Sequence, residues 1–309
     1  RINKFYFICS YFDYKYIRFN KSDDYYFLLA NNSTNKEDKK NYVNSYFLSS
    51  GLSLISTENL FGKSSFYISN SKNKYISHRV SVIMTSFNNE ANIEKSIYSI
   101  LNQYSVDIEL IIVDDASSDS TVDIIKKITL YDSRVRSFFL NKNIGTYAAK
   151  NIALSMASGK YLAFQDADDF SHPERLIESI LRLEKQKYLV AVSSRYIRLT
   201  DQGQFVSSKK IPLIRWSPLT LVIKREIVLT ELREFDSVRF GADSEFFARL
   251  IASFGIKAHA IIDKVLMICS DRENSLMKEN ASFFGFSIQR KDYQNFYNER
   301  ILRELHNNK

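Results

Sequence analysis

Apolar runs with the length of strands alternate with helix-like segments along the middle of the chain. Four such runs, rich in β-branched residues, span 79–87, 109–115, 134–140 and 160–166. Apolar residues recur at helical spacing in the segments that follow them, 88–103, 117–128, 146–156 and 171–186. Because strands alternating with amphipathic helices form parallel sheets, the pattern predicts an α/β fold with a mostly parallel, doubly wound sheet and helices on both faces.

The start of the chain lacks this alternation. Residues 1–78 are rich in aromatic residues without clear periodicity, with a polar loop expected at 31–40, a short helix at 41–55 and a linker at 69–78. Since Arg1 is not Met, we expect a small helical appendage whose own start has been removed. It has no acidic cluster after a strand, so residues 1–78 are not expected to carry chemistry, and a chain that begins near Ser77 is expected to keep its ligand binding if it remains soluble.

The other two parts of the chain follow from the same pattern. Residues 79–280 are expected to form the main domain. Residues 281–309 predict an amphipathic helix that packs on this domain or on a partner. Its apolar side is expected to carry Ile288, Phe296, Ile301 and Leu305.

Composition narrows the class of protein without naming its chemistry. The 309 residues are 45% hydrophobic and carry a net charge of +8, with basic residues spread along the chain. No nucleic-acid-binding motif appears, so no nucleic-acid partner is expected. No apolar run reaches about 18 residues, the length of a membrane-spanning helix. The two cysteines lie far apart and indicate a reduced, cytoplasmic location. Loose attachment to the anionic inner face of the membrane stays open.

Three carboxylates cluster at the end of the fourth predicted strand, in "FQDADDFSHPERL" (164–176). Asp166, Asp168 and Asp169 repel one another unless a cation lies among them, and hard divalent cations prefer oxygen ligands. A simple turn explains the same residues, because Asp is common in turns and Ser171 with Glu174 has the spacing of a capping box. This stretch alone leaves metal site and turn equally open.

Polar residues also follow the first two predicted strands. In open α/β sheets, ligands bind beyond the carboxyl ends of the strands. Thr85, Phe87, Asn88 and Glu90 follow the first strand and Asp114 and Asp115 the second. The first strand is not followed by a glycine-rich loop, which disfavours a phosphate held on a helix N-terminus and favours one held by a metal on the Asp cluster.

These motifs, in this order and spacing, closely resemble the inverting, nucleotide-sugar-dependent glycosyltransferases of family 2, which have the GT-A fold. The resemblance covers about residues 79–270 and rests on "VSVIMTSFNNEANIEKSIYSILNQ", "IELIIVDDASSDST", "NIGTYAAKN" and "GKYLAFQDADD". Together with "TLVIKREI" and "GADSEF" downstream, it is nearest to bacterial capsule and glycosaminoglycan glycosyltransferases, such as the heparosan glucuronyltransferase.

The resemblance implies a nucleotide site. Asp114 matches the position that binds uracil, and Thr85 and Phe87 line the same pocket, with Asn88, Glu90 and Asp115 beside them. The positions that close over the nucleotide match Asn143, Gly145 and Lys150.

The resemblance also implies a Mn²⁺ or Mg²⁺ site. Asp166 and Asp168 match the D-x-D motif, with Asp168 as metal ligand and Asp166 as ligand or as partner of the ribose. Many members supply a further His late in the fold. Here that stretch, "LMICSDRENSLM" (266–277), has none, so Asp271 is the candidate and Arg272 a candidate diphosphate contact. His172 is expected at the surface.

The catalytic base of the family matches Asp243, with Glu245 in reserve. Members often have a Glu-Asp pair here, but Ala242 takes the first place. The structural alternative is that Asp243 only caps the helix that follows. Trp216, the single Trp, is a candidate for stacking on an acceptor sugar, with core packing as an equal alternative.

The expected activity is transfer of a sugar from a UDP-sugar to a growing capsule or lipopolysaccharide glycan. The resemblance implies UDP-glucuronate first and UDP-N-acetylhexosamine second. The competing hypothesis is a catalytically silent carbohydrate- or nucleotide-sugar-binding domain of a larger synthase. A sugar-nucleotide pyrophosphorylase is disfavoured, because its glycine-rich loop is missing.

Overall fold

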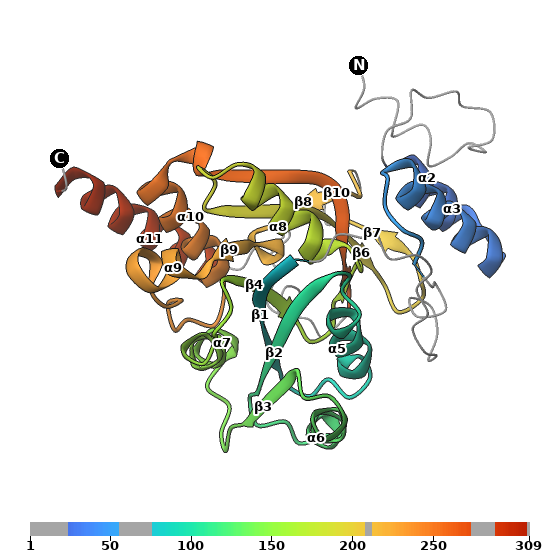
Figure 1. The fold of residues 1–309 in the computed structure, drawn as a ribbon, viewed down its shortest axis with the longest axis horizontal. Coiled ribbons are helices and arrows are strands. Elements are labelled where there is room, and N and C mark those ends of the chain that lie inside the picture. Colours follow the sequence, from blue (N-terminus) through green and yellow to red (C-terminus); the bar gives the residue numbers. More distant parts are fainter. Residues whose placement is uncertain (1–23, 56–75, 208–211, 273–287, 308–309) are drawn as a thin grey trace.

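The computed structural model describes residues 24–55, 76–207, 212–272 and 288–307 (Figure 1). Its centre is a ten-stranded sheet in the order β3-β2-β1-β4-β9-β6-β10-β5, with β7 and β8 also paired to β6. The strands are β1 (Ile76–Ser86), β2 (Val106–Asp114), β3 (Val135–Phe139), β4 (Tyr161–Asp166), β5 (Phe170–Ser171), β6 (Ala191–Leu199), β7 (Phe205–Val206), β8 (Arg215–Trp216), β9 (Val222–Lys224) and β10 (His259–Ser270). All four predicted strands form, and the first begins three residues earlier, inside the predicted linker.

The sheet has a parallel half and a mixed half. Strands β1 to β4 pair in parallel, and β6 pairs in parallel with β10, whereas β9 joins the halves by antiparallel pairing with β4 and β6. In the parallel half Thr85 lies opposite both Val113 and Asp166, and Ser86 lies opposite Asp114. The polar residues after β1, β2 and β4 therefore gather at one edge, as predicted from the sequence.

Helices cover both faces of this sheet. The helices are α2 (Tyr25–Asn32), α3 (Lys36–Ser49), α5 (Ile93–Leu101), α6 (Thr121–Tyr131), α7 (Thr146–Ser155), α8 (Arg175–Lys185), α9 (Arg225–Ile227), α10 (Ala242–Phe254) and α11 (Ile288–Asn307), with short helical turns η2 (Pro218–Thr220), η3 (Val228–Leu232) and η4 (Ile256–Ala258). One hydrophobic cluster packs α5, α6 and α8 on one face, and a second packs α7 and α10 on the other. The doubly wound α/β architecture is confirmed.

A close backbone approach fixes the start of β4 against β1. A Cβ added at Gly159 would lie 2.6 Å from the Ser81 nitrogen and 2.7 Å from the Arg79 oxygen. Only glycine fits there without moving one strand. This contact sets the relative position of the two strands whose far ends carry Thr85 and Asp166.

The predicted capping box at the start of α8 is wrong. Ser171 belongs to β5, and its hydroxyl donates to Gln165 Oε1 at 2.7 Å. Glu174 accepts a hydrogen bond from the Ser53 backbone N–H at 2.8 Å instead of closing back on its own helix. The extra strand β5 delays the helix to Arg175, so both residues serve tertiary contacts.

The predicted N-terminal appendage is helical but is not separate from the sheet. Helix α3 begins at Lys36, inside the predicted loop, because Asn35 accepts from the Glu37 N–H and caps it. Phe27, Tyr46 and Phe47 are buried in a third hydrophobic cluster, shared with strands β5, β6, β7 and β10. Helices α2 and α3, here called the helical pair, are therefore packed into the body of the fold.

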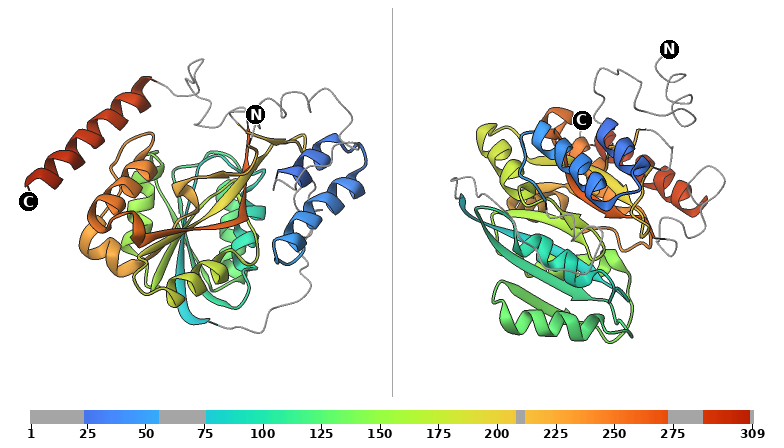
Figure 2. Two further views of the ribbon diagram at one scale, coloured as in Figure 1. Left: turned by 90° about the horizontal axis from the view of Figure 1, so that it is seen from above. Right: turned by 90° about the vertical axis from the view of Figure 1, so that its right-hand side faces the viewer.

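The C-terminal helix α11 forms, and it lies on the opposite side of the molecule from the helical pair (Figure 2). Its buried face matches the predicted one only in part. Tyr297 and Ile301 are buried, whereas Ile288 and Phe296 are 75% and 61% exposed. The side chain of Leu305 lies outside the described part. Among the described helices, none combines the length and apolarity needed to cross a membrane.

Candidate active site

Asp114 is fully buried at the end of β2 and is held by its own neighbourhood. Its carboxylate accepts from the Ser86 hydroxyl at 2.8 Å and from the Ser117 hydroxyl and N–H at 2.6 and 2.8 Å. These three hydrogen bonds tie the end of β1 to the turn after β2. Asp114 thus shapes the base of the candidate nucleotide pocket, with little free acceptor capacity of its own.

Asp115 fastens the loop before α7. Its carboxylate accepts from the Ile144 and Gly145 N–H groups at 2.7 and 2.8 Å, and the Asn143 side chain donates to the Asp115 carbonyl at 3.2 Å. Gly145 has φ +91°, a conformation that a side chain would strain. The Thr85 and Thr146 hydroxyls meet at 2.8 Å. The structure therefore brings the predicted Thr85, Asp115, Asn143 and Gly145 together.

The turn after β1 is braced from the turn after β2. Asn88 Oδ1 accepts from the Ser118 N–H at 2.8 Å, and Glu90 accepts from the Ser120 N–H at 2.9 Å. Asn88 and Glu90 thus hold the rim of the site together. The ring of Phe87, by contrast, is 50% exposed at the same edge and offers a flat apolar surface.

The acidic cluster after β4 is balanced by two cations. Lys150 Nζ donates to Asp166 at 2.9 Å, and Arg272 donates to Asp168 at 2.6 Å and to Asn89 at 2.7 Å. Burial raises the pKa of the Asp168 carboxyl, which Arg272 opposes and Asp166 reinforces. Removal of the carboxyl from water is the main cause of this shift, because burial disfavours the charged form.

Asp169 is tied to the end of β10 by a backbone hydrogen bond. It is buried and accepts from the Ser270 N–H at 2.9 Å, and burial followed by the charge of Asp168 raises its pKa well above the usual value. Within the described residues, no three Asp, Glu, His or Cys side chains converge as a metal site, Asp271 included. Asp166 and Asp168 are thus the two carboxylates that could share a cation.

Asp243 lies in the first turn of α10 but does not cap it. The N-cap is Gly241, with φ +80° and without a side-chain cap hydrogen bond. Asp243 Oδ1 instead accepts from the Tyr147 hydroxyl at 2.9 Å. Burial, and next the charge of Asp243, raises the pKa of Tyr147 well above its ordinary value. Tyr147 therefore stays protonated and serves as a fixed donor to this carboxylate.

Helix α7 joins Asp243 to the acidic cluster. Lys150 lies one turn after Tyr147, and its Nζ lies 5.6 Å from the Tyr147 ring centre while it binds Asp166. Burial lowers the pKa of Lys150, but the carboxylates of Asp166 and Asp243 outweigh burial and raise it. One helix thus carries a donor to the candidate base and a cation to the D-x-D motif.

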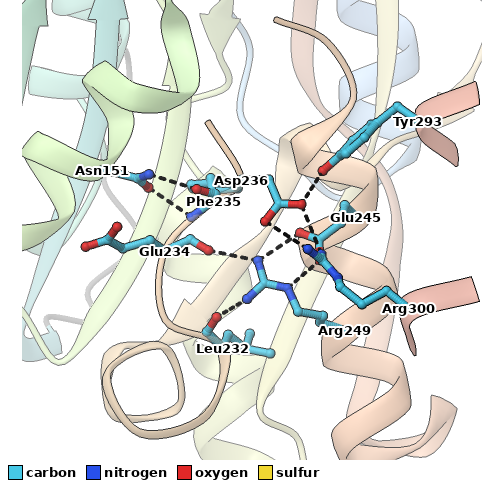
Figure 3. Close-up of polar contacts among 9 residues, drawn as sticks. All are labelled: Asn151, Leu232, Glu234, Phe235, Asp236, Glu245, Arg249, Tyr293 and Arg300. Carbon is cyan, nitrogen blue, oxygen red and sulfur yellow. Dashed lines mark hydrogen bonds and ion pairs between the residues drawn. The ribbon is translucent and has the colours of Figure 1, made fainter. Parts of the chain in front are cut away.

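Glu245, the reserve candidate for the base, is engaged elsewhere. It is fully buried and pairs with Arg249, at 2.6 Å, and with Arg300 of α11 (Figure 3). Arg300 also binds Asp236 at 3.0 Å, and Tyr293 donates to Asp236 at 2.7 Å. This cluster fixes α11 against α10, at a residue two positions after Asp243. Both oxygens of Glu245 are thus engaged by Arg249, and one of them also by Arg300, which favours a structural role.

Aromatic contacts decide the expectations for Trp216 and His172. Trp216 is half-buried, with ring centres 5.0 Å from Phe247 and 5.9 Å from His259, which favours the core alternative. The surface position expected for His172 is wrong: it is buried against Phe47, and its Nε2 lies 3.1 Å from the Ser53 carbonyl. The helical pair covers His172, which no local pattern indicates.

Comparison with known proteins agrees with this geometry. The model of Glycosyl transferase family 2 matches residues 81–247, just over half of the 309 residues. An uncharacterized glycosyltransferase of Haemophilus influenzae is 34% identical over 178 residues, which cover 54% of this chain and 70% of that protein. The Escherichia coli UDP-Glc:alpha-D-GlcNAc-diphosphoundecaprenol beta-1,3-glucosyltransferase WfaP is 38% identical over 38% of this chain and 46% of its own length.

A solved structure shows the same fold at low sequence identity. S. aureus TarS 1-349 in complex with UDP-GlcNAc superposes with a TM-score of 0.54 at 19% identity, covering 64% of this chain and 60% of that one. The matched region, residues 81–247, includes the strand ends, the D-x-D motif and Asp243. A family match across all these parts, on a sheet of this topology, makes the chain a member of glycosyl transferase family 2.

Proposed function

We propose that the chain transfers a sugar from a UDP-sugar to a glycan acceptor, with a divalent cation on the D-x-D carboxylates and Asp243 as the general base. One observation carries this proposal. Helix α7 links Asp243, through Tyr147, to Asp166, through Lys150, at the edge of the sheet where ligands bind. Helix α7 thereby holds the proposed base, Asp243, at a fixed distance from Asp166, the carboxylate proposed to bind the cation and, through it, the diphosphate.

The nucleotide is assigned to the edge formed by β1 and β2. The exposed ring of Phe87, after β1, offers a stacking surface for a base, and the buried carboxylates Asp114 and Asp115 lie at the end of the neighbouring strand β2. WfaP is named for UDP-Glc, and TarS was solved with UDP-GlcNAc, which supports a uridine diphosphate carrier here. For the sugar, glucuronate comes first and N-acetylhexosamine second, with a capsule or lipopolysaccharide glycan as acceptor.

Asp166 and Asp168 fit a Mn²⁺ or Mg²⁺ ion. Two oxygen ligands at one edge suit a hard cation that completes its shell with phosphate and water. Burial raises the pKa of Asp168, Arg272 opposes this and Asp166 adds to it, and a bound cation would favour the ionised carboxylate. A bound cation would offset the charge that develops on the leaving diphosphate. Arg272, which already reaches Asp168 and Asn89, is placed to contact the same phosphates.

The chain's own residues then carry the proton. Tyr147 occupies Oδ1 of Asp243 and fixes the plane of the carboxylate, so Oδ2 takes the proton from the acceptor hydroxyl. The acceptor oxygen attacks the anomeric carbon as the bond to UDP breaks, and a single displacement inverts the anomeric configuration. Mechanisms of this kind need no enzyme nucleophile.

The test measures binding and chemistry separately. UDP is titrated calorimetrically with and without Mn²⁺, and product formation from a panel of UDP-sugars is followed by NMR, which also reports the anomeric configuration. Asp168→Ala is expected to lose the Mn²⁺ enhancement of UDP affinity, whereas Asp271→Ala keeps it. Asp243→Asn is expected to bind UDP normally and to lose turnover by about a hundredfold to ten-thousandfold.

Two results would count against the proposal. Equal Mn²⁺ enhancement in Asp168→Ala and the parent would remove the metal assignment. UDP binding without transfer or hydrolysis of any UDP-sugar would instead support the catalytically silent binding domain. Asp123→Asn, an exposed carboxylate on α6, is the matched control and is expected to match the parent.

A further inference from the structure

The helical pair is fixed to the catalytic sheet by paired polar contacts as well as by its apolar face. The Asn31 side chain donates to the Phe205 carbonyl and accepts from the Phe205 N–H, both at 2.7 Å. The Asp24 carboxylate accepts from the Leu213 and Ile214 N–H groups, each at 2.9 Å. Lys39 donates to the Gly203 carbonyl at 2.8 Å. The pair therefore has one defined position on the sheet.

A cavity of about 820 Å³ lies between this pair and the sheet. Its walls come from the α2–α3 connection, the start of α5, the β6–β7 turn and the ends of β5 and β10, and Asp168 lies on its lining. The volume falls in the range of about 300–1,000 Å³ usual for ligand sites. Since Asp168 is a D-x-D carboxylate, the cavity reaches the candidate metal position.

The chemistry of the walls suits a carbohydrate. The cavity is lined by side-chain amides and hydroxyls from both components, among them Asn32, Thr34, Asn92, Thr200 and Gln202. Amides and hydroxyls both donate and accept hydrogen bonds, as sugar hydroxyls require.

Two lysines add positive charge to the same walls. Lys36 lies at the exposed start of α3, and Lys95 lies half-buried on α5. Within the described part of the chain, neither side chain makes a hydrogen bond or close ion pair. Burial lowers the pKa of Lys95, and the charge of Asp201 opposes this only in part. An anionic group bound in the cavity would have both ammonium groups on its walls as charged hydrogen-bond donors.

We propose that this cavity binds the acceptor, and that the acceptor is an anionic glycan whose carboxylate or phosphate contacts Lys36 and Lys95. The inference rests on the proposed function, because it places the acceptor beside the donor site at Asp168. The helical pair then supplies one wall of the acceptor site. The acceptor chain enters along the pair, and its growing end points toward the D-x-D motif.

The experiment uses the full chain with UDP and Mn²⁺ present and three probes. The first probe is trigalacturonate, the second is the neutral trisaccharide of galactose, and the third is glucose 1-phosphate. Each is titrated by saturation-transfer NMR. Trigalacturonate and glucose 1-phosphate separate a uronate carboxylate from a phosphate as the source of the anion. The variants are Lys95→Gln and the double variant Lys36→Gln/Lys95→Gln. Lys127→Gln, an exposed lysine on α6, is the matched control.

We expect at least one anionic probe to bind at least fivefold more tightly than the neutral trisaccharide. That preference falls at least threefold in Lys95→Gln and disappears in the double variant, while Lys127→Gln matches the parent. Equal binding of neutral and anionic probes, binding unchanged in the double variant, or failure of all three probes to bind would each overturn the proposal. UDP affinity, measured in the same samples, reports on the donor site alone and so separates this failure from failure of the proposed function.

Discussion

Replacing Arg300 with Met would remove one of the two guanidinium groups that hold the buried Glu245 carboxylate. Loss of one partner from a buried ion pair costs about 3–5 kcal/mol. Two features reduce the cost here: Glu245 keeps Arg249 at 2.6 Å, and the Arg300 side chain is 31% exposed. We therefore expect the free energy of unfolding to fall by about 1–3 kcal/mol.

The assay is urea denaturation followed by the fluorescence of Trp216, the single Trp of the chain. Arg303→Met is the control on the same helix. Its pair with Glu299 spans 3.4 Å between side chains that are 78% and 69% exposed, so the change should stay within about 0.5 kcal/mol.

A double-mutant cycle with Glu245→Gln isolates the charge interaction. If the buried carboxylate causes the loss, Arg300→Met should cost about 1–2 kcal/mol less in the Glu245→Gln background. Because Glu245 follows Asp243 by two residues on α10, the single variant should also lower turnover more than UDP affinity. An equal cost of Arg300→Met in both backgrounds would refute the reasoning and leave only the lost pair with Asp236 and the lost packing of α11.

Three further outcomes are expected. Burial lowers the pKa of His259 to about 4, whereas the same side chain in the unfolded chain has a pKa of about 6.5, so the unfolded chain takes up a proton first as pH falls. The parent should therefore lose about 1 kcal/mol of stability between about pH 6.5 and 5, and His259→Gln should not. Urea titrations at each pH measure this difference. Tyr147→Phe removes one hydrogen bond to Asp243 and should lower turnover roughly tenfold with UDP affinity kept, in steady-state kinetics beside calorimetry. Deletion of everything before Ile76 should give an aggregating chain in size-exclusion chromatography, because it uncovers the cluster shared with the helical pair; a monomeric, UDP-binding deletion would contradict this.

The alternation of strands and helices could be predicted from the sequence because each element shows its own period. The same alternation predicted which polar residues meet, since the carboxyl ends of parallel strands lie at one edge of the sheet. These residues are Thr85, Asp115, Asn143 and Asp166. The predicted capping box failed because Ser171 and Glu174 have partners elsewhere in the fold, at Gln165 and Ser53. Local spacing cannot reveal a competing tertiary partner.

The contacts that position Asp243 had no signal in the sequence. Tyr147 lies 96 positions before Asp243, and Arg300 lies 55 positions after Glu245. Each is an ordinary residue on an amphipathic helix until the fold brings the helices together. The packing of the helical pair was missed for the same reason, because the strands that bury its aromatic residues come much later in the chain.

The helical pair also constrains how the chain is made. The Tyr46 hydroxyl accepts from the Val265 N–H at 2.9 Å, a partner 219 residues later. At about 5–20 residues per second, the ribosome needs roughly 10–45 s to reach that partner after the pair has emerged. During this interval Phe27 and Phe47 lack the strands that later bury them. Helices α2 and α3 are thus synthesised well before the strands on which they dock, and the nascent chain needs protection from aggregation until β10 is complete.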